Sequence, residues 1–346
     1  MKVLVTGGSG FIGSNLVANL IADGVTVMNF DAAAPLCAAQ ESVWQHGSIL
    51  DASETAAAFA DFQPTHVVHL AARTDCDESC TVDDYRQNTD GTRNVLDAVR
   101  NTPSIERLIV TSTQFVCRPG YKPKHDEDFN PHTIYGQSKV ITEQLTRRAD
   151  LSCVWTMIRP TTIWGPWLLR HRDQFFRVLK RGLYLHPGGR PCMRSWGYVG
   201  NVVFQIRRIL ELPADEVDRR IVYVGDPPIN LFEWVNGASL KLTGKPVRKV
   251  PRALLYCLAM LGNVVQFCGL KAPLTTSRYR SMTEDYLTPM DRTLELVGDS
   301  PYSMDEGLDE TMRWIADPPS YSPRRPSDAE PADRVEQLSA VPMGSH

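Results

Sequence analysis

The sequence lacks a surplus of charge of either sign. Its 37 Lys and Arg residues face 40 Asp and Glu residues, which gives a net charge of −3 over 346 residues. Proteins that bind nucleic acid through a basic surface carry an excess of cations, so no nucleic-acid partner is expected. Hydrophobic residues at 42% and charged residues at 22% exclude a disordered chain and are typical of a globular enzyme.

Long apolar runs are also missing. The closest candidate, Ala253 to Leu270, contains Asn263 and Gln266, so a membrane-spanning helix is not expected. We predict a helix within 250–270 that is buried in the second lobe or at a subunit contact, and a helix at a membrane surface is the alternative. No signal peptide precedes the first apolar run, because Lys2 is followed at once by a short strand pattern and glycines, and a cytoplasmic location is expected.

The eight cysteines form no CxxC pair. Without a secretory signal they are expected to be reduced thiols. Cys76 and Cys80 have a spacing that could serve a metal ion, but no set of partner ligands accompanies them. No metal site is therefore predicted.

The first half of the chain alternates short β-branched runs with helical patterns. Strands are predicted over 2–6, 25–30, 66–70, 107–112 and 153–159. Helices are predicted from Ile12 to a stop at Asp23-Gly24, and over 53–61, 83–100 and 135–148. This alternation predicts an α/β fold with a Rossmann-type, doubly wound parallel sheet.

The pattern changes after Pro160, where loops lengthen and helices are predicted over 173–181, 202–212, 231–242 and 304–315. We predict a sheet domain over 1–160 with a return segment near 194–225. A smaller, mainly helical substrate lobe is expected over 161–316. The stretch 317–346 has six prolines and is expected to be a loosely ordered tail.

A glycine-rich turn links the first strand to the first helix. Its spacing is Gly7-x-x-Gly10-x-x-Gly13. Gly7 permits a tight turn, Gly10 lets the backbone approach a pyrophosphate, and Gly13 lets the helix pack on the strand. The N-terminus of the helix that follows supplies oriented N–H groups to phosphates, and Phe11 and Ile12 are therefore included among the predicted cofactor contacts. In this context the turn predicts a dinucleotide site.

Asp31 ends the second strand, 18 residues after Gly13. A carboxylate at this place accepts hydrogen bonds from the adenosine ribose and repels a 2′-phosphate. Ala32 and Ala33 follow, so no adjacent cation could pair with such a phosphate. NAD is therefore predicted over NADP, and a purely structural turn with an exposed Asp31 is the alternative.

Three side chains form a candidate catalytic set. Tyr135 and Lys139 lie one helical turn apart, where a cation is expected to lower the pKa of the phenol and make Tyr135 a general base. Thr113 follows the strand over 107–112, at the sheet edge where ligands bind, and could bond the same substrate oxygen. The alternatives are a solvated helix face for the pair and a capping hydroxyl for Thr113.

With these motifs in order, the sequence resembles the extended short-chain dehydrogenase/reductase superfamily, in its NAD-dependent sugar epimerase/dehydratase branch, over residues 1–316. The motifs are Thr6-Gly7-Gly8-Ser9-Gly10-Phe11-Ile12-Gly13, His69-Leu70-Ala71-Ala72, Asn88-x-x-Gly91-Thr92, Thr111-Ser112-Thr113, Pro131-x-Thr133-x-Tyr135-Gly136-x-Ser138-Lys139, Arg159-Pro160, Trp164-Gly165-Pro166 and Arg194-x-x-x-Tyr198-Val199.

The resemblance implies a role for each matched position. Thr113, Tyr135 and Lys139 would be catalytic, and Lys139 would also bind the nicotinamide ribose. The implied cofactor contacts further include Ser48, Ile49, Leu70, Ala71, Ala72, Asn88 and Pro160, with Ser48 replacing the usual Asp and Asn88 acting as support. Arg194 would clamp a substrate diphosphate, assisted by Arg280 and less directly by Arg278, and a surface ion pair is the alternative for Arg194. Thr162 stands where many members bind a substrate phosphate through Asn.

Departures from the family pattern make two of the family's reactions, dehydration and decarboxylation, less expected. Gln114 and Phe115 stand where dehydratases carry an acidic pair and decarboxylases a Glu, and neither residue can act as acid or base. We therefore predict an NAD-dependent epimerase of a nucleotide sugar, acting at C4.

Thr162 and the apolar stretch 250–270 support an alternative, a dehydrogenase of hydroxysteroids or lipid alcohols. A non-catalytic NAD-binding regulator is the third reading. The resemblance also implies a homodimer through the helices at 83–100 and 135–148.

Overall fold

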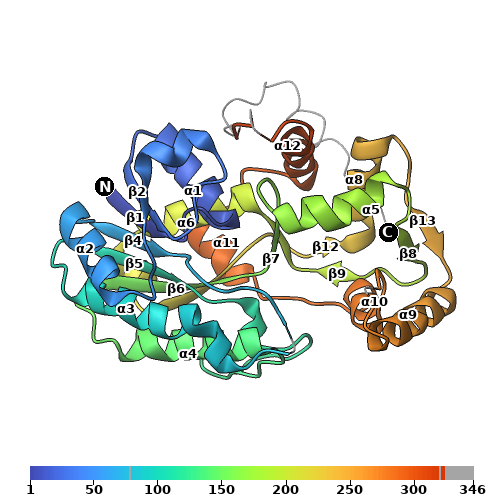
Figure 1. Cartoon of the computed structure of the whole chain (residues 1–346), viewed down its shortest axis with the longest axis horizontal. Coiled ribbons are helices and arrows are strands. Elements are labelled where there is room, and N and C mark those ends of the chain that lie inside the picture. The colour runs from blue at the N-terminus through green and yellow to red at the C-terminus, as the bar shows by residue number, and fades with distance from the viewer. Residues whose placement is uncertain (78, 271, 319–320, 324–346) are drawn as a thin grey trace, which may run out of the picture.

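The centre of the molecule is a parallel β-sheet. The computed structural model describes residues 1–77, 79–270, 272–318 and 321–323 (Figure 1). Seven parallel strands lie in the order β3-β2-β1-β4-β5-β6-β11. Their bounds are β1 (Lys2–Thr6), β2 (Thr26–Asp31), β3 (Trp44–His46), β4 (His66–His69), β5 (Arg107–Thr111), β6 (Val154–Pro160) and β11 (Arg220–Val224). The order reverses between β1 and β4, which is the switch point of a doubly wound sheet. The predicted fold class is confirmed.

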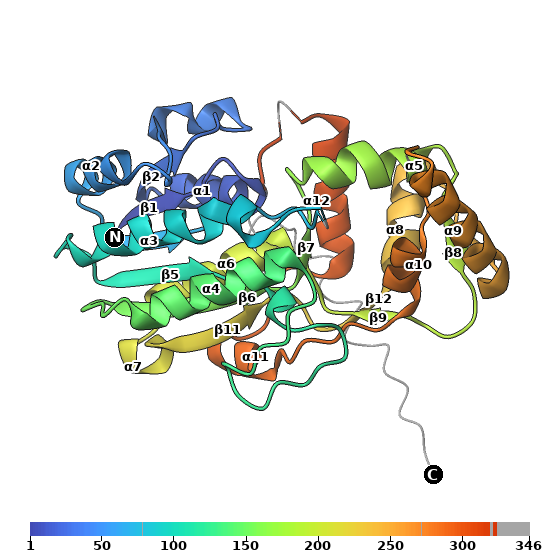
Figure 2. The ribbon, with the colours of Figure 1, turned by 60° about the horizontal axis from the view of Figure 1, so that its bottom comes forward.

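Helices cover both faces of this sheet. One face carries α1 (Phe11–Ala22) and α6 (Val199–Glu211), and the other carries α2 (Ala52–Phe62), α3 (Asp90–Arg100) and α4 (Ile134–Arg148) (Figure 2). The strands alternate between the two layers. Val3 and Val5 of β1 join the cluster under α1 and α6, whereas Leu4 between them joins the cluster under α2 and α3. This two-residue alternation explains why the strands are apolar on both faces.

The second lobe combines helices with three two-stranded sheets. β7 (Thr162–Trp164) pairs with β10 (Trp196–Tyr198), β9 (Met193–Arg194) with β12 (Ile229–Asn230), and β8 (Leu185–Pro187) with β13 (Arg248–Val250). The remaining α-helices of the described chain are α5 (Arg177–Lys180), α7 (Ala214–Val217), α8 (Leu231–Thr243), α9 (Arg252–Phe267), α10 (Thr276–Thr283), α11 (Asp291–Val297) and α12 (Met304–Ala316). Shorter turns are η1 (Ala38–Val43), η2 (Val82–Asn88), η3 (Gln114–Val116) and the π-helical η4 (His171–Phe176).

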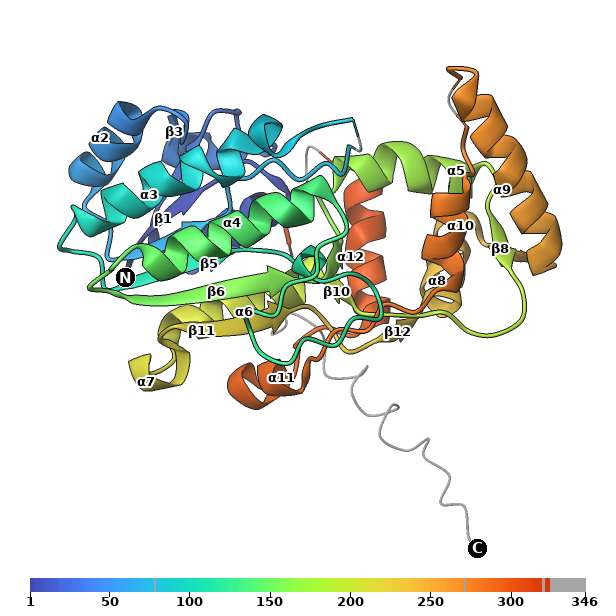
Figure 3. The same ribbon diagram turned by 90° about the horizontal axis from the view of Figure 1, so that it is seen from below.

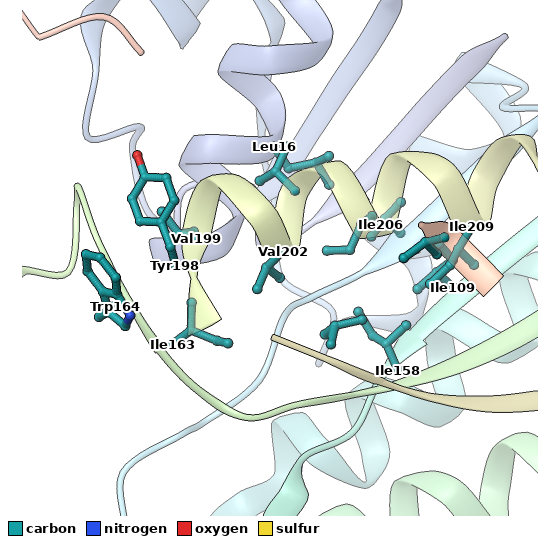
Figure 4. Close-up of a cluster of buried hydrophobic side chains, with 14 of the residues drawn as sticks. Leu16, Ile109, Ile158, Ile163, Trp164, Tyr198, Val199, Val202, Ile206 and Ile209 are labelled. Atoms are coloured by element: carbon teal, nitrogen blue, oxygen red, sulfur yellow. The ribbon is translucent and has the colours of Figure 1, made fainter. Parts of the chain in front are cut away.

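A continuous apolar core joins the two lobes. Figure 4 shows Val202, Ile206 and Ile209 of α6 between Leu16 of α1 and Ile109 and Ile158 of the sheet. The same cluster continues into the second lobe through Trp164 and Tyr198, whose ring centroids are 5.1 Å apart. This cluster is shared by the two lobes, whereas the cluster under α2 and α3 belongs to the sheet domain alone.

One predicted helix is wrong over its first half. Only Asp90–Arg100 of the predicted 83–100 helix is α-helical, and the preceding Val82–Asn88 is a 3-10 segment with a kink at Tyr85. Tyr85 is fully buried and its hydroxyl donates to the Asp75 carbonyl at 2.7 Å. The side-chain amide of Asn88 accepts a hydrogen bond from the Arg73 N–H and donates one to the Arg73 carbonyl. These tertiary contacts with the loop after β4 override the local helical preference.

The structure contradicts burial of the 250–270 helix within the second lobe. Of the sixteen residues of α9, only Leu255 and Ala259 are buried. The helix contacts the rest of the lobe through one narrow stripe, and its other apolar side chains face outward. No helix within the described residues has the length and apolarity needed to cross a bilayer.

The expected proline-rich tail lies largely outside the described residues, which end at 318 apart from the segment 321–323. Within that segment Tyr321 is buried. Its ring packs against Trp167, and its hydroxyl donates to Glu310 at 3.0 Å.

A buried ion pair fixes α4 to the sheet. The Arg159 guanidinium at the end of β6 donates to both carboxylate oxygens of Glu143 on α4, at 2.7 and 2.8 Å. Both side chains are almost completely buried. Ser112 donates to the same carboxylate at 2.6 Å, and Arg159 also donates to the Asp126 carbonyl and the Tyr223 hydroxyl. The pair therefore ties β5, β6 and α4 together at one point.

We expect Arg159→Met to lower the free energy of unfolding by about 3–5 kcal/mol, because it leaves the buried Glu143 carboxylate without its bidentate partner. Arg147 lies 3.9 Å from the same carboxylate but forms no hydrogen bond to it. Urea unfolding followed by circular dichroism measures the loss. The double variant Arg159→Met/Glu143→Leu removes both charges and should regain most of the stability. A single variant as stable as the wild type would contradict the interpretation.

Candidate functional site

The glycine turn after β1 forms a narrow cradle. Gly7 has φ +74°, and a Cβ on it would lie 2.5 Å from the Ala71 nitrogen. A Cβ on Gly13 would lie 2.2 Å from the Gly7 carbonyl oxygen. None of the described side chains caps the first N–H groups of α1, and its first turn holds no acidic residue. A helix start of this kind suits an anionic group, so the cradle fits the diphosphate of a dinucleotide.

Asp31 lies beside this turn at the end of β2. Its carboxylate accepts hydrogen bonds from the backbone N–H groups of Ser9 at 3.0 Å and Ala33 at 2.9 Å. The Gly47 N–H donates to the Asp31 carbonyl at 3.2 Å, which brings the following Ser48 and Ile49 to the same sheet edge. These contacts bring Asp31, Ser48 and Ile49, the residues predicted to contact the adenosine, to one edge of the sheet.

The loop after β4 completes the cradle. Leu70 N–H donates to the Thr6 carbonyl at 3.0 Å, so Leu70, Ala71 and Ala72 run past the glycine turn. Asn88 holds the loop from the other side. Its amide nitrogen donates to the Arg73 carbonyl at 2.9 Å and to the Ser138 hydroxyl at 2.8 Å. Asn88 therefore supports the site by joining this loop to α4. Pro160 lies at the end of β6, paired with Val224 of β11.

The three predicted catalytic side chains meet at the carboxyl edge of the sheet. The Thr113 hydroxyl, just beyond β5, shares a hydrogen bond with the Tyr135 hydroxyl and accepts another from the Phe115 N–H at 3.3 Å. Thr133 caps α4 by accepting from the Gly136 N–H at 2.9 Å, which fixes where the helix begins. Lys139, one turn further, donates from Nζ to the Thr111 carbonyl at 2.8 Å.

The expected lowering of the Tyr135 pKa by Lys139 is not found. Burial raises the pKa of Tyr135 above its ordinary value of 10, and the bond with Thr113 offsets only part of this effect. Burial likewise lowers the pKa of Lys139 from 10.5 to about 7, although the Glu143 carboxylate favours the ammonium. In the protein alone, desolvation is therefore the main influence on the pKa of both buried groups.

Gln114 and Phe115 form the wall next to Tyr135. The Phe115 ring lies edge-on to the Tyr135 ring, with centroids 6.2 Å apart, and 6.0 Å from the Tyr286 ring. Gln114 is buried. Its amide donates to the Thr162 hydroxyl at 3.0 Å and accepts from the Thr288 hydroxyl at 2.9 Å. This wall supplies no carboxylate beside Tyr135.

Some residues of the site were missed from the sequence. The Tyr286 hydroxyl donates to the Gln114 and Cys117 carbonyls at 3.1 and 2.7 Å, and so joins the second lobe to the loop after β5. No local pattern marks Tyr286 or Thr288. Glu143 had a signal, because it continues the four-residue spacing of Tyr135 and Lys139 along one face of α4.

Arg194 and Arg280 have different environments. Arg194 is half-buried, donates to the Glu284 carbonyl at 3.0 Å and lies over the Tyr286 ring. No described carboxylate pairs with it, and its Nε has no hydrogen-bond partner among the described residues. Arg280 is 73% exposed and lies 3.9 Å from the Glu284 carboxylate. The structure therefore brings Arg194 to the site wall and leaves Arg280 on the surface of α10, beside Arg278, which donates to the Pro273 carbonyl.

A group of possible metal ligands lies in the loop after β4. Asp75, Asp77 and Cys80 each have one ligand atom within 4.8 Å of the others. Asp75 is already paired with Arg73 at 2.7 Å, and Asp77 accepts from both the N–H and the hydroxyl of Ser79. Both carboxylates therefore already have hydrogen-bond partners within the same loop.

Comparison with known proteins agrees with this geometry. The sequence model of the NAD dependent epimerase/dehydratase family matches residues 3–225. Among solved structures, the fold is similar to UDP-glucose 4-epimerase from Thermotoga maritima, with a TM-score of 0.70, 22% identity, and coverage of 91% of this chain and 99% of that chain. UDP-glucuronic acid 4-epimerase from Bacillus cereus is similar with a TM-score of 0.68 at 20% identity and the same coverage.

Two kinds of enzyme occur among the curated relatives. The chain is 29% identical to the N-acetyl-alpha-D-glucosaminyl-diphospho-ditrans,octacis-undecaprenol 4-epimerase of Escherichia coli O157:H7, over 90% of this chain and 95% of that protein. It is 31% identical to a 3 beta-hydroxysteroid dehydrogenase/Delta 5-->4-isomerase of Mycobacterium tuberculosis, over 67% of each chain. The glycine cradle and the matched family model lead to one conclusion: the chain belongs to the NAD-dependent epimerase/dehydratase family, within the extended short-chain dehydrogenase/reductases, and is an enzyme that uses NAD.

Proposed function

We propose that the protein is an epimerase of a sugar carried on a diphosphate, and that it inverts the hydroxyl-bearing carbon C4 through a transient ketone. The observation that carries this proposal is the environment of Arg194. A half-buried guanidinium without a carboxylate partner among the described residues is electrostatically incomplete. A diphosphate supplies the missing anion in a geometry that suits the planar fork.

Three residues of the chain would each have a separate role in the reaction. Tyr135, once ionised, would take the proton of the C4 hydroxyl, Thr113 would orient that oxygen, and the protonated form of Lys139 would stabilise the phenolate. When bound, NAD would supply the hydride acceptor. Phe115 and Gln114 offer no acid or base next to the ketone, which favours return of the hydride over loss of water.

The remaining predicted residues would hold the cofactor. Asp31 would accept from the adenosine ribose, and Ser48 and Ile49 would flank the adenine. Gly7, Gly10, Phe11, Ile12 and Gly13 would bind the pyrophosphate with Leu70, Ala71 and Ala72 alongside. The geometry of the cradle and of Asp31 supports these assignments. Thr162 would contact the substrate phosphates.

Two kinds of carrier group are candidates for the other end of the diphosphate. A nucleoside is the predicted carrier, and the E. coli relative is named for a substrate in which the diphosphate is attached to a polyprenol. The NAD-loaded protein should be incubated in parallel with UDP-glucose, UDP-glucuronic acid and undecaprenyl-diphospho-N-acetylglucosamine, and the products analysed by NMR. Formation of a C4 epimer in one arm identifies the carrier, and no epimer in any arm contradicts the proposal.

A second candidate is a 3β-hydroxysteroid dehydrogenase, supported by the identity to the mycobacterial enzymes. The two functions differ in their net redox balance. An epimerase regenerates NAD in every turnover, whereas a dehydrogenase releases a ketone and accumulates NADH. Stoichiometric NADH formation with a 3β-hydroxysteroid, together with no sugar epimerisation, would favour this candidate.

We expect Tyr135→Phe to lower kcat by about 10²- to 10⁴-fold, because it removes the general base and leaves the ring in place. Equilibrium binding of NAD, measured by calorimetry, should remain close to that of the wild type. A variant with unchanged turnover would show that another group moves the proton.

Arg194→Met should weaken binding of UDP by about 10- to 150-fold, because a charged hydrogen-bonding group is lost. Arg280→Met is the matched control and should change binding by less than about fivefold, since its ion pair is exposed. Calorimetric titration of the NAD-loaded protein measures both. Equal effects of the two variants would contradict the assignment of Arg194 as the diphosphate anchor.

The lowered pKa of Lys139 predicts a pH-dependent stability. Between pH 7 and 10.5 the unfolded state holds a proton that the folded state has lost, so the wild type gains stability as pH rises. Below pH 7 folding must bury the ammonium itself. The gain from Lys139→Met should therefore be largest near pH 7 and shrink by up to about 1.4 kcal/mol per pH unit above it. Urea unfolding at pH 7, 8 and 9 checks this, with the exposed Lys122→Met as control, and a pH-independent difference would contradict it.

A further inference from the structure

The outer surface of α9 is apolar along its whole length. Side chains at Leu254, Leu258, Leu261 and Val265 follow each other at spacings of four and three residues, so they share one helical face. Their exposed fractions are 50%, 39%, 63% and 40%. Met260, Val264 and Phe267 extend this face and are exposed by 47%, 60% and 93%. We call these seven residues the α9 face.

The polarity of α9 is opposite to that of an ordinary surface helix. A helix on a globular protein turns its polar stripe to water and its apolar stripe to the core. In α9 the inward stripe consists of Leu255 and Ala259, and the outward stripe carries no charged residue. A contiguous exposed apolar patch of this kind marks a surface that is covered in use.

The surroundings of α9 are basic. Between Glu233 and Glu284 the sequence contains no Asp or Glu and eight Lys or Arg residues, although the whole chain has a net charge of −3. Lys245, Arg248, Lys249 and Arg278 are exposed and form no ion pair with the described residues. Arg248 and Lys249 belong to β13, which leads directly into α9. Any partner that fits this region is therefore both apolar and anionic.

The position of α9 leaves the face open. Figures 1 and 3 show α9 and α10 at the far end of the second lobe, with α9 projecting away from the sheet. Asn263 holds the two helices together by donating to the Thr276 hydroxyl at 2.8 Å, and Tyr256 packs edge-on against Tyr279. A Cβ on Gly262 would lie 1.8 Å from the Leu274 carbonyl oxygen, which shows how closely the return chain approaches α9.

We propose that the α9 face docks on the surface of an anionic lipid bilayer, with the helix lying in the headgroup region. Sixteen residues of helix are about 24 Å long, shorter than the roughly 30 Å hydrocarbon core, and the helix therefore lies on the bilayer. Apolar side chains enter the acyl boundary and the flanking cations pair with lipid phosphates, as in interfacial amphipathic helices.

A second copy of the chain fits the same face less well. Two such surfaces would bring their basic residues together across an interface in which neither copy offers an acidic residue between Glu233 and Glu284. Like charges opposed in this way are repulsive. The predicted homodimer contact, through α3 and α4, lies on the sheet domain and leaves α9 exposed (Figure 1).

The docked helix is continuous with the wall of the candidate active site. After α10, the Glu284 carbonyl accepts from Arg194 and the Tyr286 hydroxyl bonds to the loop that follows Thr113. A bilayer contact at α9 therefore places the Arg194 side of the site in the membrane-proximal lobe. The docking proposal does not depend on which substrate is turned over.

Flotation of the full chain with lipid vesicles tests the proposal. We expect binding to vesicles of phosphatidylcholine with 30% phosphatidylglycerol, and weaker binding to phosphatidylcholine alone or at high salt. Leu261→Glu/Val264→Glu should abolish flotation, because it places two acids in the centre of the α9 face. Arg248→Ala/Lys249→Ala should weaken binding to anionic vesicles by about fivefold for each charge removed.

Leu36→Glu is the matched control, since Leu36 is an equally large side chain, 41% exposed, on the sheet domain. It should float like the wild type, and NAD binding by every variant verifies that the fold is intact. Absence of flotation in the wild type, or equal flotation of Leu261→Glu/Val264→Glu, overturns the proposal. If light scattering shows that this variant converts a dimer into a monomer and neither form floats, the face belongs to a second copy and the proposal is wrong.

Discussion

The bidentate contact between Arg159 and Glu143 is the constraint on which the active-site geometry depends. It joins the end of β6 to α4 one turn beyond Lys139, and Ser112 donates to the same carboxylate immediately before Thr113. The charge pair therefore acts together with the Thr133 cap and the bond from Lys139 to Thr111 to position the catalytic set. Burying such a pair carries a desolvation cost, which the additional bonds to Asp126 and Tyr223 help to offset. We interpret it as a device that fixes position more than one that adds stability.

The second lobe is attached to this rigid edge through neutral hydrogen bonds. Tyr286 and Thr288 reach Gln114 from the segment after α10, and Thr162 reaches it from β7. Gln114 thus links the two lobes through its side-chain and backbone hydrogen bonds. A substrate bound near Arg194 would lie against this link, so binding and lobe position are coupled through residues that take no part in proton transfer.

The fold could be predicted because its signals are local and repeated. Alternating strand and helix patterns, the glycine spacing and Asp31 at the end of β2 each follow from backbone geometry. The kink at Tyr85 could not be predicted, since it results from contacts of Tyr85 and Asn88 with the loop that contains Asp75 and Arg73, 10 and 15 residues earlier in the chain. The Tyr135–Lys139 pair was found by spacing, but its electrostatics were not, because pKa values depend on burial and spacing does not report burial. The exposure of α9 escaped prediction for the same reason: its composition is that of a core helix.

The placement of β11 affects how the chain can fold. β11 completes the sheet beside β6, and α6 covers one of its faces, yet both follow the first part of the second lobe in the sequence. A nascent chain that ends at Pro160 would expose β6 as an open edge and leave Ile109 and Ile158 without α6, which packs on them (Figure 4). The ribosome must therefore deliver about two thirds of the protein before the first domain can close, and the two lobes mature together as one cooperative unit.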